Sequence, residues 1–223
     1  MSFKPFNPNA ALRITRQNLP HWRQEGTTYH VTSRLADSVP KPIADEWRSK
    51  RDSWLRENGA SSVDELADEH RLDYQRLFTD RFQSILDQCH GECVLARREC
   101  ADLLIAKMIE GHGTCFDLGA WCVMPNHLHA IVTPSRGSVL GDIVKHWKGG
   151  SAFAINRLLQ RKGTLWMPEP YDHILRSEAQ WRRLSQYVAD NPREAELREG
   201  FVLGFGAEIG LTREAILERI AGL

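Results

Sequence analysis

The sequence predicts an α+β fold: a ferredoxin-like (RRM-like) antiparallel sheet with helices on one face, plus a helical insertion. The main observation is the order of the segments, which runs strand, helix, strand, strand, helix, strand and then helix. In that order, two helices cross over a mostly antiparallel sheet. The second observation is a charged, helical stretch at 43–88, which interrupts the order after the first strand.

Short runs of β-branched, aromatic and apolar residues predict the strands. These runs lie at 27–34, 115–124, 127–133 and 171–176. The second and third runs are separated only by Pro125 and Asn126, which indicates a turn between neighbouring strands.

Apolar residues at helical spacing predict two crossover helices, at 95–110 and 137–159. Ser177 is a suitable N-cap for a further helix, because its hydroxyl can accept a hydrogen bond from a first-turn N–H. We expect that helix to end at Asn191 and Pro192, because proline lacks an N–H and disfavours helical backbone in the preceding residue.

The chain is expected to have three parts. Residues 1–25 contain three prolines and no clear period, which is typical of an extended N-terminal arm. Residues 26–198 form the main domain, with the helical insertion at about 43–88. Residues 199–223 form a C-terminal tail with a short helix capped by Thr212.

The charge balance is even overall and basic in one sector. The net charge is zero and the pI is about 7.1, which argues against a protein coated in nucleic acid. Residues 136–183, however, carry nine basic and four acidic side chains, a net charge of +5. This sector could hold a phosphate backbone. Charge alone favours the simpler interpretation of a solvated helical face.

No apolar run approaches the ~20 residues that a membrane helix needs. The N-terminus also lacks the apolar core of a signal peptide. We therefore expect a cytoplasmic protein with no membrane partner. The five cysteines form no Cys-x-x-Cys pair, so we expect free thiols.

His127 and His129 stand two residues apart in the third predicted strand. Alternate residues of a strand point to the same face, so both imidazoles leave the sheet side by side. Such a pair makes a half-site for a divalent metal. An isolated His-x-His would more simply be two ordinary strand histidines.

Tyr187 and Asn191 are four residues apart on the last predicted helix, so they share one face. The tyrosine hydroxyl could attack a phosphodiester, and the Asn191 side-chain oxygen could be a third metal ligand. The simpler interpretations are a core aromatic and a helix-ending residue before proline.

Three motifs, taken in order, resemble the single-tyrosine HUH transposases of the insertion-sequence type, and especially the REP-associated tyrosine transposases. The motifs are Trp-x-Val-Met-Pro-Asn-His-Leu-His at 121–129, Trp-x-x-x-x-Tyr-Asp-His-Ile-Leu-Arg at 166–176, and Tyr-Val-Ala-Asp-Asn-Pro at 187–192. The resemblance covers about 26–36 and 95–198, and it implies that residues 26–198 are an HUH transposase-like catalytic domain.

The resemblance implies an enzyme that nicks single-stranded DNA and transfers the cut strand. Mg²⁺ or Mn²⁺ held by His127, His129 and Asn191 would polarise the scissile phosphate, and Tyr187 would attack it. The products would be a 5′-phosphotyrosine and a free 3′-OH. The implied partners are DNA hairpins from repetitive palindromic elements, and the implied assembly is a monomer or a homodimer.

The helix at 139–162 is the candidate DNA-contact element. Lys145, Lys148 and Arg157 would meet phosphates, and Trp147 would stack on bases. Lys148 and Trp147 could instead be a surface lysine and a core aromatic.

Other interpretations remain open. A non-cleaving DNA hairpin-binding protein derived from such a transposase would keep the surface and lack the reaction. A phosphodiesterase that uses water would not need Tyr187. Tyr171 is a competing nucleophile, but it has no partner four residues on. Asp172 and His173 could support the ligands or be solvated edge residues.

Overall fold

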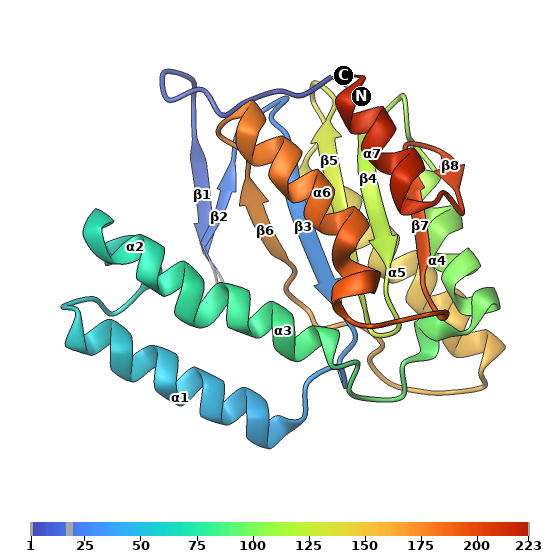
Figure 1. Ribbon diagram of the computed structural model, residues 1–223, viewed down its shortest axis with the longest axis horizontal. Helices are drawn as coiled ribbons and strands as arrows, with labels where there is room; N and C mark the ends of the chain where they lie inside the picture. Colours follow the sequence, from blue (N-terminus) through green and yellow to red (C-terminus); the bar gives the residue numbers. More distant parts are fainter. Residues whose placement is uncertain (1, 17–19, 223) are drawn as a thin grey trace.

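The structure, a computed structural model, describes residues 2–16 and 20–222. Its centre is a six-stranded antiparallel sheet in the order β6-β3-β5-β4-β7-β8 (Figure 1). The strands are β3 (Tyr29–Arg34), β4 (Phe116–Val123), β5 (His127–Pro134), β6 (Tyr171–Ile174), β7 (Val202–Phe205) and β8 (Glu208–Ile209). The helices on the sheet are α4 (Arg98–Ile109), α5 (Leu140–Leu158), α6 (Glu178–Glu194) and α7 (Arg213–Ala221).

The predicted fold class is confirmed. Along the chain, β3, α4, β4, β5, α5 and β6 follow one another, and their strands lie in the order β6-β3-β5-β4. This is the ferredoxin-like arrangement, in which two helices cross over an antiparallel sheet. Strands β3 and β5, the first and third strands of this series, are therefore neighbours in the middle of these four strands.

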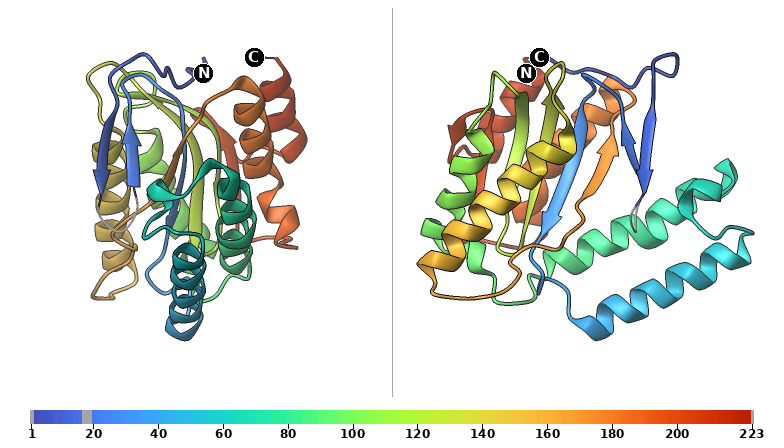
Figure 2. Two further views of the ribbon diagram at one scale, coloured as in Figure 1. Left: turned by 90° about the vertical axis from the view of Figure 1, so that its left-hand side faces the viewer. Right: turned by 180° about the vertical axis from the view of Figure 1, so that it is seen from behind.

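Helices cover both faces of the sheet, not one face as predicted (Figure 2). Leu128, Ala130 and Val132 of β5 point into the core beneath α4 and α5, whereas Ile131 points into the core beneath α6 and α7. The reason is that β4 and β5 are apolar on both sides, so each face needs a cover. The sequence indicated α6 and α7 as helices but not the face on which they lie.

Helix α6 begins as predicted and ends later. The Ser177 hydroxyl accepts a hydrogen bond from the Gln180 N–H at 3.2 Å. The predicted end at Asn191 and Pro192 is wrong, because the helix continues to Glu194 with Pro192 inside it. Buried Val188, Ala189 and Pro192 hold this part of the helix in place despite the missing N–H. Asn191 therefore keeps the face of α6 that the four-residue spacing from Tyr187 predicts.

The C-terminal segment contributes more than the short helix. The predicted helix is present as α7, and the Thr212 hydroxyl accepts from the Ala215 N–H at 3.2 Å. Strand β7, which the sequence did not indicate, pairs with β4 along 202–205. Gly204 lies opposite Trp121, where an added Cβ would be 2.1 Å from the Trp121 Cζ2 atom. The close approach of this strand to the tryptophan therefore requires glycine.

Two further units lie beside the main sheet. Strands β1 (Arg13–Arg16) and β2 (Pro20–Arg23) form a two-stranded antiparallel sheet in the segment for which an extended arm was predicted. The insertion folds back on itself as a pair of helical arms (Figure 1). Its elements are α1 (Lys41–Glu57), the short η1 (Val63–Glu65), and a continuous run of α2 (Asp68–Tyr74), the π-helical η2 (Gln75–Asp80) and α3 (Arg81–Asp87).

The insertion has its own small core. Leu55, Ala60 and Leu66 are buried together, and Trp54 and Tyr74 pack against them. Trp47 of α1 contacts Phe82 of α3, with ring centroids 4.9 Å apart. These contacts hold the two arms of the insertion together.

None of the helices in the described part of the chain combines the length and apolar composition needed to cross a membrane. All five cysteines are free, as predicted.

Candidate functional site

The site begins with the two histidines of β5. His127 and His129 are fully buried on the face covered by α6, with ring centroids 4.7 Å apart. The His127 Nδ1 atom lies 2.7 Å from the Asn126 side-chain oxygen, and the His129 Nδ1 atom lies 2.9 Å from the Thr32 hydroxyl. Among the described residues, neither Nε2 atom has a hydrogen-bond partner. Each ring therefore keeps one free nitrogen on the face of the sheet that α6 covers.

The tautomer of His127 follows from its neighbour. The Asn126 amide nitrogen donates to the His90 carbonyl, so its oxygen is the end that faces His127. A side-chain amide oxygen accepts only, so the His127 Nδ1 atom carries the proton and Nε2 carries a lone pair. A metal-ligating histidine needs this arrangement.

Burial keeps the imidazoles neutral. It lowers the pKa of His127 to about 4 and that of the adjacent His30 to about 3. The pKa of His129 falls well below its ordinary value because of burial and because His127 and His30 lie beside it. The His30 and His129 rings are stacked, with centroids 5.3 Å apart. His30 was not a predicted site residue, since nothing in its strand distinguished it from an ordinary buried histidine.

Helix α6 places Tyr187 and Asn191 beside the histidines. The Tyr187 and His129 ring centroids are 5.3 Å apart. The Asn191 side-chain nitrogen donates to the Tyr187 hydroxyl at 3.2 Å, and its oxygen is buried without a hydrogen-bond partner in the described part of the chain. The structure therefore brings all four predicted site residues into one cluster.

Asp87, at the end of α3, is a fifth member of the cluster that the sequence did not indicate. Its Oδ1 atom accepts from the Asn191 side-chain nitrogen at 3.2 Å and lies 3.8 Å from the His127 Nε2 atom. Burial raises the pKa of this carboxyl to about 6. Asp87 is one acidic residue among many in the insertion, so only the fold singles it out.

The cluster disfavours a phenolate. Burial, and then the nearby Asp87 carboxylate, raise the pKa of Tyr187 well above its ordinary value. A positive charge among these groups would stabilise the phenolate and so lower the pKa of Tyr187.

The unpaired nitrogen and oxygen atoms of the cluster are of the types that bind a divalent cation, but only three of them belong to the predicted ligands. Two neutral imidazole nitrogens and one amide oxygen are open, and all three are buried. Within residues 2–16 and 20–222, no group of three or more His, Cys, Asp or Glu side chains is arranged to hold a metal ion. The predicted set has two histidines, and an asparagine supplies the third atom.

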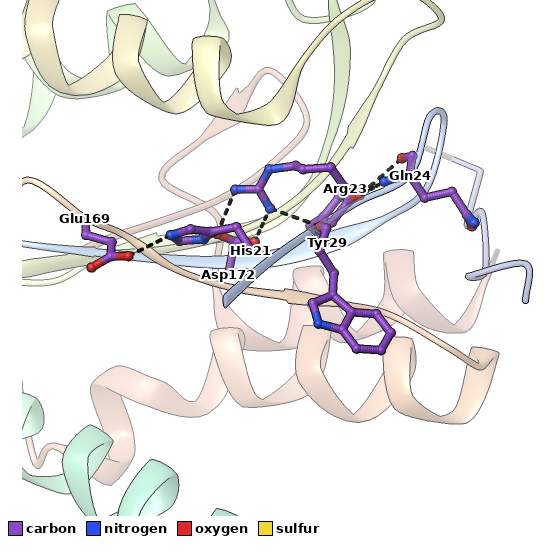
Figure 3. Close-up of polar contacts among 7 residues, drawn as sticks. His21, Arg23, Gln24, Tyr29, Glu169 and Asp172 are labelled. Atoms are coloured by element: carbon purple, nitrogen blue, oxygen red, sulfur yellow. Dashed lines mark hydrogen bonds and ion pairs between the residues drawn. The ribbon is translucent and has the colours of Figure 1, made fainter. Parts of the chain in front are cut away.

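The remaining predicted residues of β6 lie outside the cluster. Tyr171 pairs with Thr32 and is hydrogen-bonded to Thr79 of the insertion, and burial raises its pKa to about 12. The Asp172 carboxylate instead binds His21 and Arg23 of β2 (Figure 3). His173 is hydrogen-bonded to the Gln180 side chain at 2.6 Å. None of the three supports the ligands directly.

The predicted DNA-contact residues lie on α5, across the sheet from the histidines. Trp147 is fully buried against Phe116, so the prediction that it stacks on DNA bases is wrong and the core alternative is observed. The Lys148 ammonium donates to the Pro168 carbonyl at 2.6 Å. Lys145 and Arg157 are exposed.

Comparisons with known proteins found distant likenesses. No family model matches the chain, and no curated protein matches it. One similar solved structure is a REP-associated tyrosine transposase bound to a REP hairpin, with 16% identity and a TM-score of 0.43 over 80% of this chain and 74% of that chain. Another is a candidate transposase from Deinococcus radiodurans R1, with 15% identity and a TM-score of 0.29 over 85% of this chain and 98% of that chain. Both TM-scores are below 0.5, so these likenesses do not identify the chemistry of the site.

Proposed function

We propose that this protein is a metal-dependent nuclease and strand transferase that cuts single-stranded DNA through Tyr187. The observation that carries the proposal is that three buried atoms of one side-chain cluster lack a hydrogen-bond partner among the described residues: His127 Nε2, His129 Nε2 and Asn191 Oδ1. The Tyr187 hydroxyl is hydrogen-bonded to the same Asn191 amide. The Asn191 side chain thus links the proposed nucleophile to the proposed metal ligands.

The proposed cofactor is Mg²⁺ or Mn²⁺, held by His127, His129 and Asn191. When bound, it would polarise a phosphate oxygen and supply the positive charge that the site lacks. The chain's own contribution is to keep both imidazoles neutral and to leave their Nε2 atoms without hydrogen-bond partners among the described residues. Its other contribution is to hold the phenol beside them.

In the proposed reaction the Tyr187 oxygen attacks phosphorus and the bond from phosphorus to the 3′-oxygen breaks. The phenol gives up its proton, and the leaving 3′-oxygen takes one up. The 5′-phosphate remains on the tyrosine, so the energy of the broken ester is kept for rejoining to another 3′-OH. The proposed substrates are hairpins from repetitive palindromic elements, the class that the motif resemblance implies.

A gel assay tests the proposal. Hairpin DNA labelled at either end is incubated with the protein in Mn²⁺, Mg²⁺ or EDTA, and the products are separated after denaturation. We expect a metal-dependent nick, with label retained on the protein, that Tyr187→Phe and the double variant His127→Ala/His129→Ala abolish. Tyr171→Phe is the matched control, because it removes a hydroxyl from the same face of the sheet and should still cut. Cutting that survives Tyr187→Phe would contradict the tyrosine mechanism.

A non-cleaving hairpin-binding protein is the second candidate, and one observation favours it. His127, His129 and Asn191 are all inaccessible to solvent. A phosphate would reach them only after a covering segment moves. Tight hairpin binding with no nick in any metal would support this second function over the first.

A further inference from the structure

The helical insertion delivers one side chain to the candidate site. Its second arm ends at Asp87, whose carboxylate contacts Asn191 of α6 across a sequence separation of 104 residues. Figure 1 shows α3 running toward the C-terminal part of α6. The side chain is 16% exposed, so the contact is shielded from water.

The contact decides which end of the Asn191 amide faces the histidines. The terminal torsion of asparagine is broad and roughly two-fold, so the oxygen and nitrogen ends can exchange places at little cost. An ionised carboxylate can only accept hydrogen bonds, so Asp87 selects the nitrogen end. The same nitrogen also donates a hydrogen bond to the Tyr187 hydroxyl at 3.2 Å. The Asn191 oxygen is left as an open acceptor, as a metal ligand must be.

Helix stability does not explain a carboxylate at this position. Asp87 is the last residue of α3, where the helix dipole disfavours negative charge, and the last turn contains no basic residue. The Glu194 carboxylate adds a second unfavourable charge. A side chain placed against its local electrostatics is expected where function requires it.

We propose that Asp87 is a positioning residue, which holds the Asn191 amide with its oxygen toward the His127 and His129 Nε2 atoms. The inference rests on the proposed function, because it concerns the same metal-ligand set. It also gives the insertion a role, since the helical arms carry a carboxylate into a site built by β5 and α6.

Mn²⁺ binding to the full chain, measured by isothermal titration, tests the role without relying on activity. We expect Asp87→Ala to weaken Mn²⁺ binding about 10- to 100-fold, the usual cost of losing a partner that orients a ligand. Asp87→Asn keeps an acceptor oxygen and should lose less. Asp73→Asn is the matched control: it removes one exposed carboxylate from the same insertion and should bind Mn²⁺ as the wild type does.

A double-mutant cycle with Asn191→Ala separates positioning from direct ligation. If Asp87 acts through Asn191, Asp87→Ala should weaken Mn²⁺ binding in the wild-type background and have no effect once Asn191 is alanine. An equal loss in both backgrounds would overturn the proposal, because Asp87 would then act independently. Melting in EDTA identifies variants that fail to fold. If Asp87→Ala fails, Asp87→Asn takes its place in the cycle.

The two proposals fail in different ways. Unchanged Mn²⁺ binding by Asp87→Ala, with wild-type nicking intact, overturns the positioning role and leaves the proposed function standing. A wild-type protein that binds no Mn²⁺ and cuts no DNA overturns both.

Discussion

At the residue scale, each histidine of β5 is oriented by the neighbour that holds its Nδ1 atom. Asn126, in the turn before β5, fixes His127, and Thr32, on the adjacent β3, fixes His129. Thr32 and His129 are directly opposite in the antiparallel register. The register of one strand pair therefore sets the direction of a candidate metal ligand.

Replacing Thr32 with valine tests this orientation. Valine keeps the shape and removes the hydroxyl, so the buried His129 Nδ1 atom loses its partner. We expect about 1–3 kcal/mol of destabilisation in urea unfolding, and about 10-fold weaker Mn²⁺ binding in titration. The matched control is Thr28→Val, which breaks the buried contact with Thr133 at 2.8 Å instead. That variant should lose stability and keep its Mn²⁺ affinity; equal weakening in both variants would contradict a specific role for Thr32.

The residue types at the site were predictable where spacing along one element defines a face. The two-residue spacing of His127 and His129 and the four-residue spacing of Tyr187 and Asn191 each place a pair correctly. Asp87 was not predictable, because its contact joins an insertion to a distant helix. The basic residues around Trp147 favour a DNA contact, whereas burial against Phe116 determines where its side chain lies.

At the element scale, the C-terminal strand β7 extends the sheet beyond the four strands of the ferredoxin-like arrangement. It pairs with β4 through the segment around Gly204, where the Trp121 ring lies close to the strand. The strand has only four residues, Val-Leu-Gly-Phe, and the glycine in its interior weakens its strand pattern. Its identity depends on the partner strand.

Gly204→Ala should disrupt this pairing. The new Cβ would meet the Trp121 ring and the Glu208 carbonyl oxygen, at 2.1 and 2.4 Å. Since Trp121 is fully buried, the strain cannot relax into solvent, and we expect at least about 2 kcal/mol of destabilisation in urea unfolding. The control is Gly141→Ala on α5, where nothing lies within 4 Å. That variant should be neutral or slightly stabilised, and similar losses in both would contradict a close-packing role for Gly204.

Charged side chains link the β1–β2 sheet to β6 and the segment before it (Figure 3). His21 lies between the Asp172 and Glu169 carboxylates, and Arg23 also binds Asp172. The hydrogen bond with Asp172 is the largest cause that raises the pKa of His21, while burial and Arg23 act in the opposite direction. The protonated imidazole therefore favours the docked state.

The contribution of His21 should depend on pH. Because the folded pKa is raised, its stabilisation is fully present below about 6.5, the unfolded value, and is lost as pH rises through the folded pKa. Wild type and His21→Gln are compared by urea unfolding at pH 5.5, 7 and 8.5. We expect the stability difference to be largest at pH 5.5 and to shrink as pH rises. A stability difference that grows with pH would contradict the proposal that protonated His21 stabilises the contact with Asp172 and Glu169.

At the scale of the whole molecule, the sequence indicated the ferredoxin-like order because each strand and helix of that order has a strong local pattern. It did not indicate that both faces are covered, or where the insertion arms lie. Those features come from contacts between segments distant in the chain. The α3 arm, for instance, meets α6 through Asp87 and Asn191. Local periodicity carries no information about such contacts.

The closed site has a consequence for the stability of the whole chain in acid. Burial lowers the pKa of four histidines: His30 to about 3, His127 and His173 to about 4, and His129 well below its ordinary value. Below pH 6.5 the unfolded chain therefore binds protons at these positions that the folded chain does not. Asp87 opposes this trend, because its raised pKa lets the folded chain take up one proton below about pH 6.

Since four histidines outweigh one carboxyl, the metal-free protein should lose stability between pH 6.5 and 5, by about 1.4 kcal/mol per pH unit for each excess proton. Urea unfolding in EDTA across this range measures the slope. His30→Gln removes one of the four groups without altering a proposed ligand, so it should flatten the slope. Mn²⁺ that binds the native state should raise stability at pH 7 and lose this effect toward pH 5, because protons compete for the ligand nitrogens. Stability that stays constant from pH 6.5 to 5 in EDTA would contradict the neutral, buried state of the histidines on which the proposed metal site depends.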